Sequence, residues 1–271
     1  MYRIYVLFIF LILACSEGKE QEKSWHYSKS YPLKNVHPMS ITGDLSNLYV
    51  SSGLKTELHK MNYDGGLIEA IKNIRKPKYI NLLSPGVVLV AESEAHVATR
   101  VASQESINTI PTNEFLETPY GVSASGHSMV ITDYFKNRIY YNKEGKPMSF
   151  GKPGVADGDF NGPTDIQIMN GLIYVSDSRN NRVQVFDDNG KHKLSIGELD
   201  KIKMSGGIYV TNDELAVTDY QGNRVLIYSL TGKLKQVLTE NFDQPSDVFI
   251  RGKEMFVTNF YSNSISVFTK F

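Results

Sequence analysis

Residues 173–186 read IYVSDSRNNRVQVF, and residues 162–166 before them read GPTDI. Two short runs rich in Val, Ile, Tyr and Phe enclose the polar segment SDSRNN. Apolar runs of this length, bounded by turn residues, are typical of neighbouring β-strands. The segment DNG at residues 188–190 is a hairpin signal directly after them. The stretch therefore predicts a unit of short antiparallel strands joined by tight turns.

The unit recurs along the chain at a nearly constant spacing. Three segments of the form Val/Ile-Ser/Thr-Asp are followed five residues later by arginine, which gives the pairs Asp133/Arg138, Asp177/Arg182 and Asp219/Arg224. The aspartates are 44 and 42 residues apart, and the same step leads forward to Asn259 and back to Glu92 and Ser52. The sequence therefore contains six repeats of about 41 residues.

A period near 40 residues with about four short strands per unit is typical of propeller blades. No stretch after residue 24 shows a sustained apolar period of 3.6 residues, so the fold is predicted to be all-β. The last repeat has only three strand-like runs, and residues 25–33 are strand-like before the first repeat. We therefore expect a six-bladed β-propeller in residues 25–271, with residues 25–33 completing blade 6.

The repeats resemble the NHL family in GPTDI at 162–166, in residues 173–186 and in DNGK at 188–191. The resemblance is specific over residues 119–240, fair in the last repeat and weak in the first two. It implies a six-bladed ring with a binding or catalytic top face. It does not imply one activity, because NHL-type propellers include amidating lyases, lactonase relatives, RNA-binding modules and sensor domains.

The first residues have the pattern of an export signal. Residues 4–13 are apolar and follow Arg3. This run is shorter than the roughly 20 residues that span a bilayer, and it suits a signal peptide. The segment ILAC at 12–15 resembles a bacterial lipobox, which implies a lipid on Cys15. An ordinary secretory signal is the alternative.

We accordingly expect a signal peptide at residues 1–14 and a flexible tether at 15–24. The protein would be an exported bacterial lipoprotein on the periplasmic or surface face of a membrane, and Ser16 favours the outer membrane. Cys15 is the only cysteine in the chain, so a thiol nucleophile and an internal disulfide are excluded. Lys and Arg together equal Asp and Glu at 29 each, a balance that disfavours nucleic-acid binding.

The Asp/Arg pairs of repeats three to five are interpreted as structural braces. Repeats one, two and six lack the arginine, and repeats one and six lack the acid as well. A pair repeated in three blades suits a loop brace better than a catalytic centre.

Three acids are candidate metal ligands. Glu92 keeps the repeat acid without its arginine, and Asp165 and Asp247 lie two residues after blade prolines, where the channel would open. The two aspartates could hold Ca²⁺ together with backbone carbonyls, as lactonase-like relatives hold a metal, and Glu92 could bind a cation or serve in catalysis. The alternatives are a solvated Glu92 and capping of loop N–H groups by the aspartates. The sequence establishes no cofactor. The histidines fall at different positions within their repeats, so they are not expected to converge on a zinc ion.

Aromatic and arginine side chains in the predicted top loops suit recognition of a protein, peptide or glycan. The candidate binding residues are Tyr134, Phe135, Arg179, Tyr220, Phe260 and Tyr261. The alternative is that these rings pack between neighbouring loops. The sequence favours a lipid-anchored, non-catalytic binding scaffold of the cell envelope. The alternative function is a metal-dependent hydrolase or lyase of the lactonase-like type.

Overall fold

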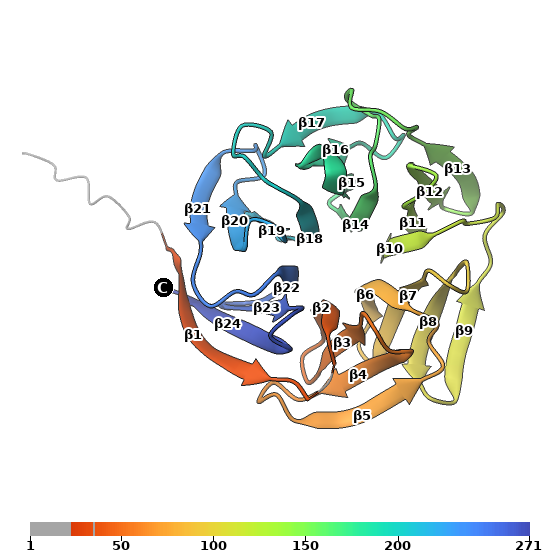
Figure 1. The fold of residues 1–271 in the computed structure, drawn as a ribbon. Coiled ribbons are helices and arrows are strands. Elements are labelled where there is room, and N and C mark those ends of the chain that lie inside the picture. Colours follow the sequence, from red (N-terminus) through yellow and green to blue (C-terminus); the bar gives the residue numbers. More distant parts are fainter. Residues whose placement is uncertain (1–22, 35) are drawn as a thin grey trace, which may run out of the picture.

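A computed structural model describes residues 23–34 and 36–271. Six four-stranded antiparallel sheets surround a central axis (Figure 1). The prediction of an all-β, six-bladed propeller is confirmed. The predicted signal peptide, Cys15 and most of the tether lie outside the described residues. Within the described residues, no helix has the length and apolar character needed to cross a membrane.

The strands of each blade follow one another from the axis outward. Blade 1 comprises β2 (Pro38–Gly43), β3 (Leu48–Ser52), β4 (Glu57–Met61) and β5 (Leu67–Lys72). Blade 2 comprises β6 (Pro77–Ser84), β7 (Val87–Glu92), β8 (Val97–Ser103) and β9 (Ser106–Ile110). Blade 3 comprises β10 (Pro119–Ser125), β11 (Ser128–Asp133), β12 (Arg138–Lys143) and β13 (Lys146–Phe150). Blade 4 comprises β14 (Pro163–Met169), β15 (Leu172–Asp177), β16 (Arg182–Phe186) and β17 (His192–Ile196), with the turn η1 (Ser178–Asn180). Blade 5 comprises β18 (Ser205–Val210), β19 (Leu215–Asp219), β20 (Arg224–Tyr228) and β21 (Leu234–Leu238). Blade 6 comprises β22 (Pro245–Arg251), β23 (Glu254–Asn259), β24 (Ser264–Lys270) and β1 (Trp25–Pro32).

The core is divided among the contacts between blades. Six clusters of buried apolar side chains each join residues of two neighbouring blades. The second strand of blade 4, β15, is buried over five consecutive residues because sheets cover it on both faces. Strands buried on both faces are apolar at successive positions rather than at alternate ones. This explains why the repeat is visible as short apolar runs in the sequence.

The N-terminal strand completes the ring. β1 pairs antiparallel with β24 from Trp25 opposite Lys270 to Pro32 opposite Ser264, and it forms the outer edge of blade 6 (Figure 1). Backbone hydrogen bonds of 3.2 Å in both directions join Ser24 and Phe271. The prediction that the N-terminal strand closes blade 6 is confirmed.

Trp25 attaches this strand to blade 5 as well. Its side chain is 2% exposed among residues of blades 5 and 6. The indole Nε1 donates to Glu214 Oε1 over 3.0 Å, and Lys270 Nζ donates to Glu214 Oε2 over 2.6 Å. The Gln236 side chain pairs with the Trp25 backbone N–H and C=O, each over 2.8 Å. Trp25 therefore holds the closing strand by packing and by hydrogen bonds to the preceding blade.

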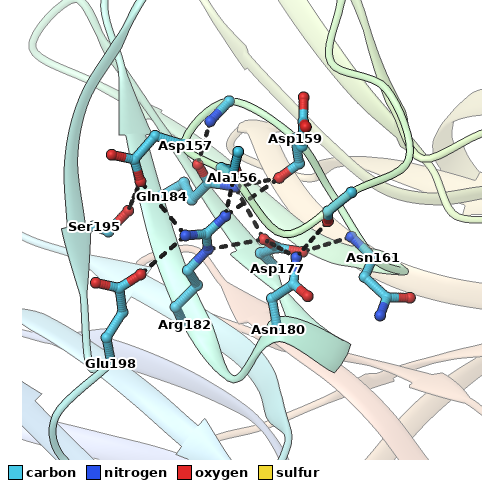
Figure 2. A network of polar contacts seen from close by, with 12 residues as sticks. Ala156, Asp157, Asp159, Asn161, Asp177, Asn180, Arg182, Gln184, Ser195 and Glu198 are labelled. Carbon is cyan, nitrogen blue, oxygen red and sulfur yellow. Dashed lines mark hydrogen bonds and ion pairs between the residues drawn. The ribbon is translucent and has the colours of Figure 1, made fainter.

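The predicted pair in blade 4 is the centre of a buried polar network (Figure 2). Arg182 Nε lies 3.0 Å from Asp177 Oδ2, and the two side chains are 4% and 0% exposed. Asp177 also accepts from Asn161 N and from the side-chain amides of Asn180 and Gln184, at 2.8 to 2.9 Å. These donors satisfy a carboxylate that is removed from water.

The guanidinium of Arg182 connects the network to the segments that precede and follow blade 4. Its Nη2 donates to the Ala156 carbonyl over 2.7 Å, in the segment that precedes β14. Its Nη1 lies 2.9 Å from Glu198, which follows β17. The side chain therefore ties the two connecting segments of blade 4 to the loop between β15 and β16 (Figure 2).

The corresponding residues of blades 5 and 3 differ from each other. In blade 5, Arg224 Nε lies 2.8 Å from Asp219 Oδ2, and Nη2 donates to the carbonyls of Asp200 and Lys201 over 2.9 and 2.8 Å. In blade 3 the expected pairing is not formed, because the exposed Arg138 donates instead to Ser149 Oγ.

Backbone donors satisfy the carboxylate of blade 3 without an arginine. The N–H groups of Glu117, Thr118 and Lys136 donate to the carboxylate of Asp133 over 2.7 to 3.3 Å. The Lys136 ammonium donates to the Phe115 carbonyl in the preceding segment. Lysine thus makes the contact to the preceding segment that arginine makes in blades 4 and 5.

The closing strand can be tested through Trp25. We expect Trp25→Ala to lower the free energy of unfolding by about 3–5 kcal/mol, because it leaves a cavity between blades 5 and 6. The midpoint of thermal unfolding should then fall by about 2–4 °C per kcal/mol. The control is Tyr27→Ala on the same strand, whose ring is 40% exposed and whose loss should cost about 1 kcal/mol. Equal midpoints for Trp25→Ala and the unsubstituted protein would contradict the closing role.

The brace can be tested with arginines from equivalent positions of two blades. Arg182→Ala leaves the buried Asp177 without its cation, and we expect a loss of about 3–5 kcal/mol in unfolding free energy. The matched control, Arg138→Ala, removes an exposed side chain and should change it by at most about 0.5 kcal/mol. Denaturant unfolding monitored by tryptophan fluorescence measures both. Similar effects of the two substitutions would argue against a brace.

Candidate functional site

A cavity of about 340 Å³ opens at the mouth of the central channel. It lies on the top face, defined here as the end of the ring at which the innermost strands begin and the loops between the second and third strands lie. All six blades contribute to its lining, which consists of Met39, Gly53, Leu54, Lys76, Lys78, Tyr79, Tyr120, Thr164, Ser178, Met204, Ser205, Gly206, Tyr220 and Phe260.

Two repeat positions supply most of this lining. The first is the second residue of each innermost strand, occupied by Met39, Lys78, Tyr120, Thr164 and Gly206 in blades 1 to 5. The second is the start of the loop after the second strand, where Gly53, Ser178, Tyr220 and Phe260 lie. Since these positions recur in every blade, the ring brings residues far apart in the sequence to one mouth.

Tyr79 closes the floor of the cavity. Its side chain is 3% exposed, and its hydroxyl donates to the Ser246 carbonyl over 3.0 Å. The bond joins β6 of blade 2 to β22 of blade 6, so the phenol crosses the channel. Burial, with a contribution from Asp247, raises the pKa of Tyr79 well above its usual value. The hydroxyl therefore keeps its proton and remains a donor.

Asp165 and Asp247 occupy the same position of the innermost strands as Tyr79. Each carboxylate accepts from the N–H of its own following residue and from an N–H of the next blade: Ile208 N donates to Asp165 over 2.8 Å, and Ile41 N donates to Asp247 over 2.9 Å. Burial raises the pKa of Asp165 to about 7, and burial together with Asp165 raises that of Asp247 well above its usual range. These acids bond to backbone N–H groups of neighbouring blades.

Gly207 lies between the two aspartates, on the intervening blade. A methyl group at this position would lie 1.9 Å from Asp247 Oδ1. Only glycine therefore leaves room for the Asp247 carboxylate beside blade 5.

Glu92 lies apart from this pair, at the end of β7. Its two oxygens accept from Arg75 N and from Thr99 Oγ1, each over 2.6 Å. It occupies the position of Asp133, Asp177 and Asp219 in the other blades. Among residues 23–34 and 36–271, no group of three or more acidic, histidine or cysteine side chains is placed to hold a metal ion. Glu92 therefore does not share a side-chain donor set with Asp165 and Asp247.

The predicted top-face residues divide into three groups. Tyr220 and Phe260 line the cavity, with ring centroids 6.4 Å apart. Tyr134 stacks on the cavity residue Tyr120 at 4.8 Å, and the Arg179 guanidinium lies 5.2 Å from the Tyr134 ring. Phe135 and Tyr261 are exposed outside the cavity lining, at 61% and 59%. Tyr220 and Phe260 are thus the predicted residues that reach the cavity directly.

Lys78, Tyr79, Tyr120 and Ser178 line the cavity without having been singled out in the sequence. A usable signal was present for two of them. The residue directly after each blade proline lies near the start of an innermost strand, at the channel mouth. This rule points to Lys78 and Tyr120. The hydrogen bond of Tyr79 to blade 6 depends on the tertiary structure.

Lys78 is the cationic group held most closely against the cavity wall. Its ammonium lies 5.0 Å from the centre of the Tyr120 ring. Burial, reinforced by the neighbouring Lys76, lowers the pKa of Lys78 to about 8. The charged form therefore predominates at neutral pH and is lost on moderate alkalinisation.

Comparisons with known proteins agree with this architecture. Residues 160–186 match the family model of the NHL repeat. A streptogramin B lyase structure has 12% identity and a TM-score of 0.68, with 92% of this chain and 98% of that chain covered. A catalytically inactive virginiamycin B lyase from Staphylococcus aureus with quinupristin has 18% identity and a TM-score of 0.67, with 92% and 88% covered.

The computationally designed protein Ika8 has 9% identity and a TM-score of 0.57, with 86% of this chain and 70% of that chain covered. No curated protein matches the sequence. At these identities the likeness to solved structures shows the fold alone. We conclude that the chain is a six-bladed β-propeller whose fourth blade contains an NHL repeat.

Proposed function

We propose that the protein is a lipid-anchored propeller of a bacterial cell envelope that binds a ligand in the cavity of its top face. The cavity itself is the observation that carries the proposal. Its volume of about 340 Å³ falls within the range of small-molecule sites, about 300–1,000 Å³. Its apolar walls, with Tyr120, Tyr220 and Phe260 among them, can bury a ligand at little cost in side-chain entropy.

The direction of the N-terminal strand suits the proposed anchor. Pro32, at the end of β1, pairs with Ser264 on the top face, whereas Trp25 pairs with Lys270 at the other end of the blade. A tether that precedes Trp25 would therefore leave the ring from the face opposite the cavity. A lipid on Cys15 would then be attached to the ring on the face away from the cavity.

The alternative of a metal-dependent hydrolase or lyase has weaker support. The likeness to streptogramin lyases concerns the fold at 12–18% identity. Asp165 and Asp247 bond to backbone N–H groups of adjacent blades, and Glu92 lies apart from them at the end of β7. A binding role requires only the cavity and its walls, and we propose it for that reason.

The cavity can be tested with an uncharged aromatic dye, N-phenyl-1-naphthylamine, whose fluorescence rises on transfer to an apolar site. We expect the protein to bind it and Tyr220→Ala to weaken binding about tenfold, because a ring is lost from the wall. Tyr261→Ala removes an exposed ring beside the cavity and is the matched control, with unchanged affinity expected. Absence of dye binding, or equal loss in both variants, would overturn the proposed site.

The anchor can be tested separately through Cys15. We expect Cys15→Ala to abolish incorporation of radiolabelled palmitate and to leave the protein either unprocessed or soluble after cell fractionation. The thioether to the lipid cannot form without the Cys15 sulfur, and the lipid is the proposed link to the membrane. If the mutant still fractionates with membranes after its leader has been removed, another feature holds it there.

A further inference from the structure

The charges of the cavity lining have a single sign. Among the described residues, Lys76 and Lys78 line it, and no aspartate, glutamate or histidine does. Asp165 and Asp247 bond to the adjacent blades at the level of Tyr79, which closes the floor. A ligand in the cavity therefore meets cationic side chains and aromatic rings.

The two lysines differ in their partners. Lys76 Nζ lies 3.1 Å from Glu94, and both side chains are about half exposed. Lys78 has no carboxylate within 4.0 Å in the described part of the chain, and its ammonium lies against the Tyr120 ring. A partly desolvated ammonium without a counter-ion gains from an anion placed beside it. Lys78 is thus the cavity cation that lacks a protein partner.

Ser178 provides a second polar group in the wall without a partner. Its side chain is fully buried, and its Oγ has no hydrogen-bond partner among the described residues. Most buried polar atoms in folded proteins are hydrogen-bonded, so a hydroxyl left free in a cavity wall suits a bond to a ligand. The equivalent position holds Tyr220 in blade 5 and Phe260 in blade 6. Serine in blade 4 therefore adds a donor where those blades present rings.

From these features we propose that the cavity binds organic anions: compact molecules with an aromatic or apolar body and one carboxylate or sulfonate group. Lys78 pairs with the acid group, and Tyr120, Tyr220 and Phe260 contact the body. Ser178, two blades away from Lys78, donates to an oxygen of the ligand. This inference rests on the proposed function, because it names the ligand class of the same cavity.

The test compares two dyes that differ by one group. The probe is 8-anilino-1-naphthalenesulfonate, and N-phenyl-1-naphthylamine has the same rings without the sulfonate. We expect Lys78→Met to weaken binding of the sulfonate about tenfold and to leave binding of the uncharged dye unchanged. Methionine preserves the length and apolar contacts of the side chain, and a circular-dichroism melt verifies the fold. The matched control is Lys253→Met, at an exposed hairpin, which should alter neither affinity.

A carboxylate competitor extends the test to the other acid group. Indole-3-acetate should displace the sulfonate dye, and the neutral indole-3-acetamide should displace it at least tenfold less well. Ser178→Ala should weaken the competition by indole-3-acetate about tenfold, because a hydrogen bond to the charged carboxylate is lost.

The pH dependence of binding provides an independent measurement. The charged and titratable groups that face Lys78 are Lys76 and Glu94, and Tyr120, whose pKa burial raises, lies against it. Because the pKa of Lys78 lies at about 8, its positive charge is lost as the pH rises through that value. Affinity for the sulfonate, which stays ionised, should fall between about pH 7 and pH 9.5 and should be flat in Lys78→Met.

The outcomes separate the two proposals. If neither dye binds, the ligand-binding function fails. If both dyes bind and Lys78→Met weakens them equally or leaves both unchanged, the cavity stands and the anion preference is overturned. If sulfonate affinity is independent of pH across this interval, Lys78 is not the group that pairs with the anion.

Discussion

Every sheet in this ring has two apolar faces, and only a neighbouring sheet can cover each of them. The six apolar clusters lie between consecutive blades, so an open ring would expose two sheet faces to water. Closure therefore depends on the contact between blades 6 and 1, together with the completion of blade 6 by β1. Trp25 and Glu214 attach that strand to blade 5, and the chain contains no internal disulfide that could replace this contact.

Successive residues of each innermost strand have different roles, because one can bond to the next blade while its neighbour lines the cavity. The third residue of the strand bonds to the next blade in two cases, through Asp165 and Asp247. The second residue points to the channel mouth and varies from Met39 to Lys78 and Tyr120. Hydrogen bonds within the channel thus hold the ring, which leaves the mouth free to carry different side chains. The same division explains why acids that seemed suited to a metal ion contact backbone N–H groups instead.

The loops between second and third strands show a similar division of roles. In each of blades 3, 4 and 5 the aspartate at the end of the second strand accepts hydrogen bonds from its surroundings, and the next residue faces the top. Blade 4 has Arg182 at the centre of its network, blade 5 has a simpler pair, and in blade 3 lysine makes the contact to the preceding segment. Backbone N–H groups of the preceding segment donate to the aspartate in all three blades, and only the side-chain partners differ. The buried carboxylate requires hydrogen bonds but not a particular side chain.

The sequence by itself determined the ring: the repeat period, the number of blades and the use of residues 25–33 to close blade 6 follow from local strand and turn signals that recur in phase. It also identified Tyr220 and Phe260, because they lie in the predicted top loops. It did not indicate that Arg138 would turn to Ser149, nor that Tyr79 would cross the channel to Ser246. The cavity could not be predicted from the sequence, because lining residues such as Lys78 and Ser178 are about one hundred residues apart in the chain. Those features were decided by the tertiary structure, because the partner of a side chain at the axis comes from another blade, and the distance between blades is set by how the whole ring closes.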